Sequence, residues 1–143
     1  MRIVDVNVLL HAVNTDSDRH EESRDWLDES LSGAAPVGFA WVALLGFVRI
    51  ASDRRVFPEP LGVDAALDIV DAWLGAPGAI EVRPGPDHAR VLRRLLDGAN
   101  GAARLVTDAH LAALAIEHGG TVVTYDTDFA RFDGVRWAIP GTV

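Results

Sequence analysis

Short apolar runs that stop at an aspartate constrain the fold of this chain more than any other feature. Three such runs end at Asp5, Asp108 and Asp126, and Asp128 follows two residues after the third. The segments between them carry apolar residues at helical spacing, which predicts βαβ units around a mostly parallel sheet. Because ligands bind at the carboxyl ends of strands in open α/β sheets, we expect the aspartates to meet at one edge.

The turn and cap residues divide the chain into alternating elements without a linker or an internal repeat. We therefore expect a single domain over residues 1–143. The predicted strands cover residues 2–5, 37–40, 80–82, 105–106 and 121–125, with an edge strand at 136–139. The predicted helices cover residues 8–13, 19–31, 41–51, 63–74, 88–96 and 107–118, with a turn or short helix at 126–132.

Composition excludes several chemistries. All thirteen basic residues are arginine, so the chain has no P-loop lysine and no lysine for Schiff-base chemistry. The absence of cysteine excludes zinc ribbons, Fe–S clusters and cysteine nucleophiles. A net charge of -8 argues against broad non-specific attraction to nucleic acid. The first ten residues form neither a signal peptide nor a membrane span, which predicts a cytoplasmic protein.

Each of the four aspartates has an ordinary structural explanation when taken alone. Asp5 and Asp108 suit helix caps or first-turn positions, and Asp126 with Asp128 suits an Asx-turn. Together, however, clustered carboxylates stay ionised only with a partner, and Mg²⁺ or Mn²⁺ with its preference for oxygen ligands supplies one. The residues therefore predict metal-assisted phosphate chemistry, with Arg49 as a candidate phosphate contact.

With these residues in view, the chain resembles PIN-domain proteins of the VapC ribonuclease-toxin family nearly from end to end. The resemblance is carried by residues 4–10 (VDVNVLL), 106–115 (VTDAHLAALA) and 123–129 (VTYDTDF), with support from residues 41–49 (WVALLGFVR). It implies a three-layer α/β/α fold and Mg²⁺- or Mn²⁺-dependent endonucleolytic cleavage of RNA. It also implies a homodimer and neutralisation by a cognate VapB-type antitoxin in a type II toxin–antitoxin system.

The resemblance also assigns roles to individual residues. Asp5 and Asp108 match the family's first and third acids, and the later acidic positions fall on Asp126 and Asp128. We expect Asp5 and Asp108 to ligate one ion, while Asp126 and Asp128 orient water or complete a weak second ion site. Two further residues, Asn7 and Thr107, are expected to hydrogen-bond to the metal ligands.

One position departs from the family pattern. The second acid, usually a glutamate in the helix after the second strand, falls at Gly46, which has no side chain to bind metal. Asp53 lies seven residues further on, about 10 Å along a helix, and is too far away to replace it. This departure keeps open a catalytically silent PIN-fold module that binds RNA or protein. A haloacid-dehalogenase-type phosphatase is a weaker alternative, because Asn7 stands where a second carboxylate is needed.

Overall fold

A five-stranded, fully parallel sheet forms the centre of the molecule. The computed structural model describes residues 1–143, and the sheet has the order β3-β2-β1-β4-β5. Arg2 of β1 pairs with Val37 of β2 on one side and with Thr121 of β4 on the other. The strands are β1 (Arg2–Val4), β2 (Val37–Phe39), β3 (Ala79–Glu81), β4 (Thr121–Val123) and β5 (Trp137–Ala138).

The strand order creates a switch point between β1 and β4. From β1 the chain builds the sheet outward through β2 and β3, and it then returns to the other side of β1 to add β4 and β5. Connections that leave adjacent strands in opposite directions open a crevice at the carboxyl ends of those strands. The residues that follow β1 and β4, Asp5 and Asp126 among them, therefore lie where this fold class binds ligands.

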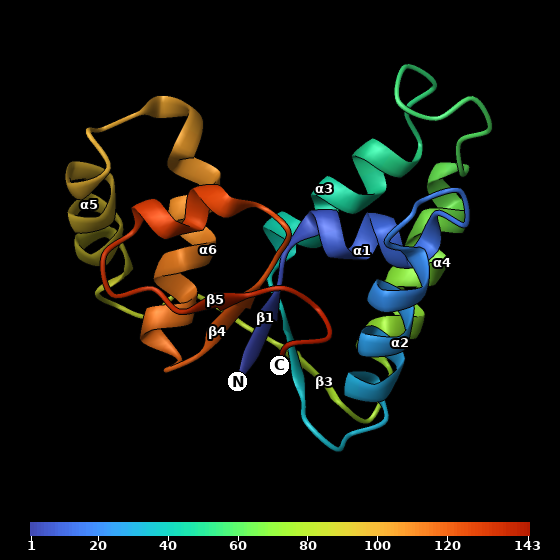
Figure 1. Cartoon of the computed structure of the whole chain (residues 1–143), viewed down its shortest axis with the longest axis horizontal. Helices are drawn as coiled ribbons and strands as arrows, with labels where there is room; N and C mark the ends of the chain where they lie inside the picture. Colours follow the sequence, from blue (N-terminus) through green and yellow to red (C-terminus); the bar gives the residue numbers. More distant parts are fainter.

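Helices cover both faces of the sheet, which confirms the predicted three-layer α/β/α architecture. In Figure 1 the helices form two groups, one on each side of the strands. The first group is α1 (Val6–Val13), α2 (His20–Leu31), α3 (Trp41–Ala51) and α4 (Val63–Leu74), and the second is α5 (His88–Gly98) and α6 (Val106–Glu117). No helix combines the length and the apolar character needed to cross a membrane.

Successive side chains along the strands point to opposite faces of the sheet, and this produces two separate cores. Ile3 and Val122 point toward α5 and α6, whereas their neighbours Val4 and Val123 point toward α1 to α4. In both cases the side chains are fully buried. Because the inner strands are apolar on both faces, they are stable only between two helical layers.

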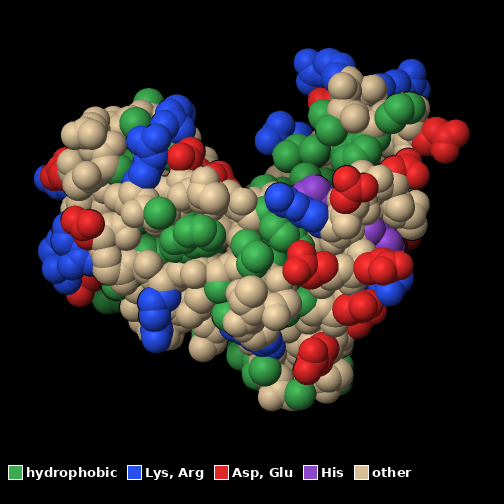
Figure 2. All heavy atoms as spheres, in the orientation of Figure 1, with side chains coloured by type: hydrophobic (Ala, Val, Ile, Leu, Met, Phe, Trp, Pro, Cys, Tyr) green, Lys and Arg blue, Asp and Glu red, His purple; other side chains and the backbone are tan.

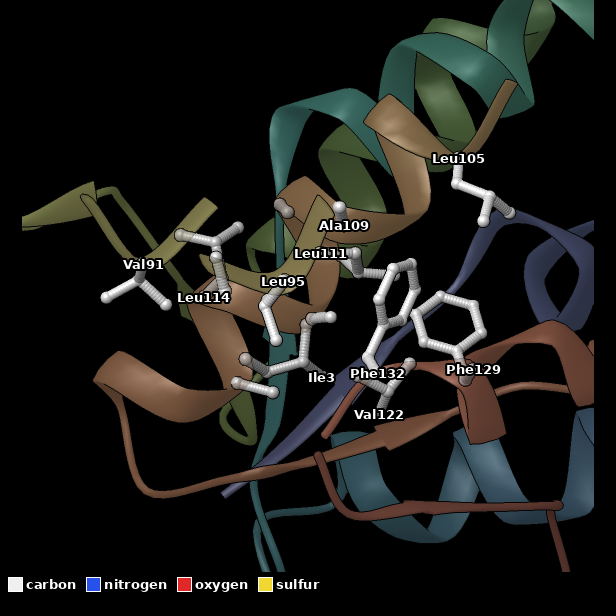
Figure 3. Close-up of a cluster of buried hydrophobic side chains, with 14 of the residues drawn as sticks. Ile3, Val91, Leu95, Leu105, Ala109, Leu111, Leu114, Val122, Phe129 and Phe132 are labelled. Carbon is white, nitrogen blue, oxygen red and sulfur yellow. The ribbon is translucent and has the colours of Figure 1, made fainter. Parts of the chain in front are cut away.

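The core under α5 and α6 also fixes the segment that follows β4. A 3₁₀ helix, η2 (Thr127–Arg131), carries Phe129, which is fully buried and packs edge-to-face on Phe132 at 5.9 Å between ring centroids. Figure 3 shows both rings turned into the cluster that contains Ile3, Val122 and Leu111. This packing anchors the neighbouring Asp126 and Asp128 on a rigid support.

The prediction of a strand at residues 105–106 is wrong. Leu105 belongs to a short 3₁₀ helix, η1 (Ala103–Leu105), which runs directly into α6. Its side chain is fully buried, so the apolar run reflects core packing rather than a strand. The other predicted strands and helices are present, with ends that differ by at most two residues, and β5 is the predicted edge strand.

Candidate active site

Asp5 lies at the junction of β1 and α1, and uncharged donors hold its carboxylate. Oδ1 accepts a hydrogen bond from the Val6 backbone N–H at 2.7 Å, so Asp5 caps α1. Oδ2 accepts from Thr124 Oγ1 at 2.7 Å and from Asn7 Nδ2 at 2.8 Å. Only 7% of Asp5 is exposed, so these bonds fix its orientation without neutralising its charge.

Asn7 and Thr124 join the end of β1 to the end of β4. The Asn7 amide donates from Nδ2 to Thr124 Oγ1 at 3.0 Å, and Asn7 Oδ1 accepts from the Tyr125 backbone N–H at 3.0 Å. The same Thr124 hydroxyl accepts from the Asp126 backbone N–H at 2.9 Å. Thr124 is fully buried. The two residues hold the Asp5 and Asp126 segments in one arrangement, and Thr124 was not among the predicted site residues.

The surroundings of Asp5 favour its neutral form. Burial raises the pKa of Asp5, the hydrogen bonds from Thr124, Val6 and Asn7 oppose that rise, and the charge of Asp126 adds to it. The net result is a raised pKa. No arginine or histidine pairs with this carboxylate, so its charged form has no compensating cation within the chain.

Asp108 reaches the same site from a helix rather than from a strand end. It lies in the first turn of α6, is half-buried and makes no side-chain hydrogen bond. Its pKa is raised to about 6, chiefly by burial and further by the charges of Asp5, Asp126 and Asp128, while the charge of Arg104 opposes the rise. These mutual charge effects show that the predicted aspartates lie near one another. Asp5, Asp108 and Asp126 are called the acid cluster below.

Asp126 and Asp128 do not share one role. Asp126 Oδ1 accepts from the Asp128 backbone N–H at 2.8 Å, which is the Asx-type cap of η2. Asp128 instead turns to two arginines: its Oδ2 accepts from Arg104 at 3.1 Å and its Oδ1 from Arg131 at 3.1 Å. The hydrogen bond from Arg104 is the main reason that the pKa of Asp128 is lowered. Asp128 is therefore charge-compensated, unlike the acid cluster.

At Gly46, where the resemblance places the family's second acid, α3 packs closely against α1. A Cβ at residue 46 would lie 3.2 Å from Val6 Cγ2, and Val6 directly follows Asp5. Asp53 does not replace the missing acid, because α3 ends at Ala51 and the Asp53 carboxylate pairs with Arg55 at 3.0 Å. The structure thus offers no glutamate or aspartate from α3.

Arg49 and Thr107 are both exposed. The Arg49 side chain, in the last turn of α3, makes no ion pair within 4.0 Å and is available to an external anion. Thr107, next to Asp108, makes no side-chain hydrogen bond to any aspartate. The hydroxyl that does contact a site aspartate belongs to Thr124.

The donor set of the acid cluster suits a hard divalent cation. All of its side-chain ligands are carboxylate oxygens, the type that Mg²⁺ and Mn²⁺ prefer. No three His, Cys, Asp or Glu side chains converge closely enough to form a complete cage around an ion. Mg²⁺ does not need such a cage, since it is held by one or two carboxylates and completes its shell with water and phosphate oxygens. The carboxylates of the acid cluster are therefore suitable ligands for a Mg²⁺ or Mn²⁺ ion.

The acid cluster lies at an open edge rather than in a closed pocket. Figure 2 shows the molecule hollowed between a lobe over α5 and a lobe over the ends of α3 and α4, with basic atoms on both rims. In the same view of Figure 1 the carboxyl ends of the strands face this notch. A cavity of about 340 Å³ lies elsewhere, between Leu10, Phe47 and the loop with Phe57. An open notch is accessible to a polymer.

The chain is similar to known proteins over nearly its whole length. The sequence profile of the PIN domain family matches residues 2–135. The protein named Ribonuclease VapC37 from Mycobacterium tuberculosis is 56% identical over 140 residues, which are 98% of this chain and 97% of that protein.

Two solved structures share the fold. The structure of Mycobacterium tuberculosis VapC20, titled a Sarcin-Ricin loop cleaving toxin, has a TM-score of 0.68 at 17% identity, covering 95% of this chain and 99% of that one. VapBC2 from Rickettsia felis, bound to a DNA fragment from its promoter, has a TM-score of 0.65 at 15% identity, covering 96% of this chain and 97% of that one. Together with the family match and the identity to VapC37, they lead to one assignment: the chain belongs to the PIN-domain family, in its VapC branch.

Proposed function

We propose that this protein is a Mg²⁺-dependent endoribonuclease, with Mn²⁺ able to replace Mg²⁺, and the toxin of a type II toxin–antitoxin module. The observation that carries the proposal is the pair Asp5 and Asp108. Two carboxylates from different elements face one edge of the sheet, and no cation of the chain pairs with either within 4.0 Å. Such a site is stable at neutral pH when an external cation supplies the missing charge.

Asp5 and Asp108 would hold the ion, and Asp126 would orient water beside it or hold a weak second ion. A bound divalent cation supplies Lewis-acid stabilisation of the attacking and leaving oxygens of a phosphodiester. The chain's own contribution is orientation. Asn7 and Thr124 fix the Asp5 carboxylate through uncharged hydrogen bonds, so its negative charge remains available to the ion.

Arg49 would bind a phosphate of the RNA. Its guanidinium is exposed and free of ion pairs, and it lies on α3 three residues after Gly46. An acidic protein needs such local cations to bind a polyanion, because its overall charge of -8 repels one.

The proposed partners are a VapB-type antitoxin and a second copy of the chain. The similar structure from Rickettsia felis is that of VapBC2, and Ribonuclease VapC37 is 56% identical to this chain over 140 residues. Leu45, Val63 and Leu67, on α3 and α4, leave apolar surface exposed, as an obligate partner surface requires.

A catalytically silent module is the second candidate, and Gly46 is the observation that favours it. The site lacks one family acid, and Val6 occupies part of the space beside that position. The phosphatase alternative loses support, because the Asn7 amide is fully used in bonds to Asp5, Thr124 and Tyr125.

Cleavage of a labelled total-RNA pool separates the two candidates. The ribonuclease predicts cutting by purified protein with Mg²⁺ or Mn²⁺, none with chelator, and a loss of about a thousandfold in Asp108→Asn, since a metal ligand accounts for several kcal/mol of transition-state stabilisation. The circular dichroism spectrum of Asp108→Asn should match that of the wild type. RNA that binds but stays intact with either metal would establish the silent module instead.

A further inference from the structure

Asp128 brings two arginines together at the rim of the acid cluster. Arg104 Nη1 donates to Oδ2 and Arg131 Nε donates to Oδ1, each at 3.1 Å, so the two guanidinium groups occupy different oxygens of one carboxylate. Arg104 comes from η1 and Arg131 from η2, two segments that are far apart in the sequence. Only Asp128 links their charged groups. Arg104 and Arg131 are called the arginine pair below.

Chain connectivity places the arginine pair next to the acids. Arg104 lies four residues before Asp108 of α6, and its positive charge acts to lower the pKa of that carboxylate. Asp128 in turn is bound through its backbone N–H to Asp126. The buried Phe129 ring, between Asp128 and Arg131 in sequence, keeps this side of the notch rigid.

The contacts of the arginine pair leave most of its donors free. Each guanidinium has five N–H groups, and each spends one on Asp128 in the bonds above. The side chains are 60% and 52% exposed. Ion pairs this exposed add little to stability, so structural support alone does not explain why one carboxylate aligns two arginines here.

A backbone phosphate fits the remaining donors. A nucleic acid that places one phosphate at the acid cluster brings its next phosphates close to the same three carboxylates, which repel them. Guanidinium groups on the adjoining wall offset that repulsion and bind phosphate through several hydrogen bonds. Figure 2 shows basic atoms on both rims of the notch.

We propose that Arg104 and Arg131 bind an RNA phosphate that flanks the one cleaved, and that Asp128 is a positioning residue that aligns them instead of a metal ligand. The inference rests on the proposed ribonuclease function. Its chemistry is phosphate recognition, and it assigns no base preference.

Salt-dependent RNA binding tests the arginine pair without requiring turnover. The probe is a short fluorescein-labelled single-stranded RNA of mixed sequence, and the protein carries Asp108→Asn to prevent cleavage. Adding Arg104→Ala or Arg131→Ala should weaken binding about tenfold and reduce the slope of log K against log salt by about 0.7 each, the value for one lost phosphate contact on a single strand. Arg90→Ala is the matched control, because Arg90 is also exposed and paired with an aspartate, but lies on α5.

Cleavage kinetics test the role of Asp128. In the otherwise wild-type protein, Asp128→Asn should raise the KM for RNA several-fold while leaving kcat and the Mg²⁺ concentration for half-maximal rate within about twofold. Arg104→Lys should recover part of the KM that Arg104→Ala loses. A metal ligand would behave differently, since its loss would raise the Mg²⁺ requirement and lower kcat.

The outcomes separate this inference from the proposed function. If the wild type cuts RNA but the arginine variants keep its KM and salt slope, the arginine pair does not bind substrate and the ribonuclease stands. A raised Mg²⁺ requirement in Asp128→Asn would likewise overturn the positioning role. If the wild type does not cut RNA, the proposed function fails, and the salt slopes alone decide whether the arginine pair binds RNA.

Discussion

Asp5 and Asp128 both follow strands at the switch point of the sheet, yet they have opposite surroundings. Asp5 is nearly fully buried and receives its hydrogen bonds from a hydroxyl, an amide and a backbone N–H, so burial prevails and its pKa is raised. Asp128 is partly exposed and receives its bonds from two arginines, so its pKa is lowered. Uncharged donors orient a carboxylate and leave its charge for an external cation, whereas arginines neutralise it.

The same contrast divides the notch into two functions. The acid cluster is oriented and uncompensated, as a metal centre requires before the metal arrives. The arginine pair is oriented and partly compensated, as a phosphate contact requires. Sequence alone shows four similar aspartates, and only the donors around each one distinguish a metal ligand from a residue that aligns arginines.

Removing the hydroxyl of Thr124 should have the largest effect of the changes considered, because it supports the acid cluster. Thr124→Val keeps the shape but leaves the Asp126 backbone N–H and one bond of Asp5 unsatisfied in a buried place. We expect a loss of about 1 to 3 kcal/mol in the free energy of unfolding and a ten- to hundredfold slower RNA cleavage. Urea denaturation and cleavage rates measure the two effects. Thr124→Ser retains the hydroxyl and should stay near wild type; equal losses in both variants would mean that packing, not the hydrogen bonds, matters.

Adding a glutamate at Gly46 should strengthen metal binding by the acid cluster. Gly46→Glu places a carboxylate beside Val6, with a Cβ only 3.2 Å from that side chain. We expect about 1 to 3 kcal/mol lower stability without metal, from crowding and added repulsion, and Mn²⁺ binding that is several-fold tighter. Gly46→Gln has the same size without the charge and should lose stability without the gain in affinity. A Mn²⁺ affinity that rises equally in both variants would contradict this.

Stability against pH should expose the uncompensated charge of Asp108. Its pKa is about 6 in the folded protein and about 3.9 when unfolded, so between these values the folded state binds more protons. The free energy of unfolding should therefore fall as pH rises through this window, by about 1 to 2 kcal/mol after allowing for solvent screening.

The measurement is thermal or urea unfolding of metal-free wild type minus that of Asp108→Asn, which lacks the titrating group. Saturating Mg²⁺ should restore stability above pH 6 and have little effect at pH 4. A difference curve that rises with pH would show that Asp108 already has a cationic partner in the folded chain.

The smallest effect on stability is expected when the arginine pair loses Asp128. Asp128→Asn breaks two exposed ion pairs, so the melting temperature should remain unchanged within error. Differential scanning calorimetry of this variant beside Thr124→Val makes the comparison direct. A melting temperature as low as that of Thr124→Val would make Asp128 a structural residue and remove the contrast.

Much of this arrangement could be predicted because it is local. The capping position of Asp5 after β1, the apolar helix α3 and the Asx-type turn at Asp126 follow from neighbouring residues. The strand predicted at residues 105–106 was wrong, because a buried Leu105 just before a helix gives the same short apolar pattern as a strand.

Long-range contacts account for the rest. Thr124 is a β-branched residue in a strand context, and nothing nearby marks it as a hydrogen-bond partner of Asp5, 119 positions away. Its signal was a polar residue at the end of a buried run. The link from Arg104 to Asp128 spans 24 positions, and its partners lie in two segments whose contact depends on packing over α6.

Direct Mn²⁺ binding at neutral pH is the measurement closest to the central claim, which is that the acid cluster is a preorganised cation site. Isothermal titration or electron paramagnetic resonance of the wild type should show one well-held ion, lost in Asp5→Asn and in Asp108→Asn and retained in Asp128→Asn. Absence of binding in the wild type, or loss of the ion in Asp128→Asn with retention in Asp108→Asn, would contradict the claim.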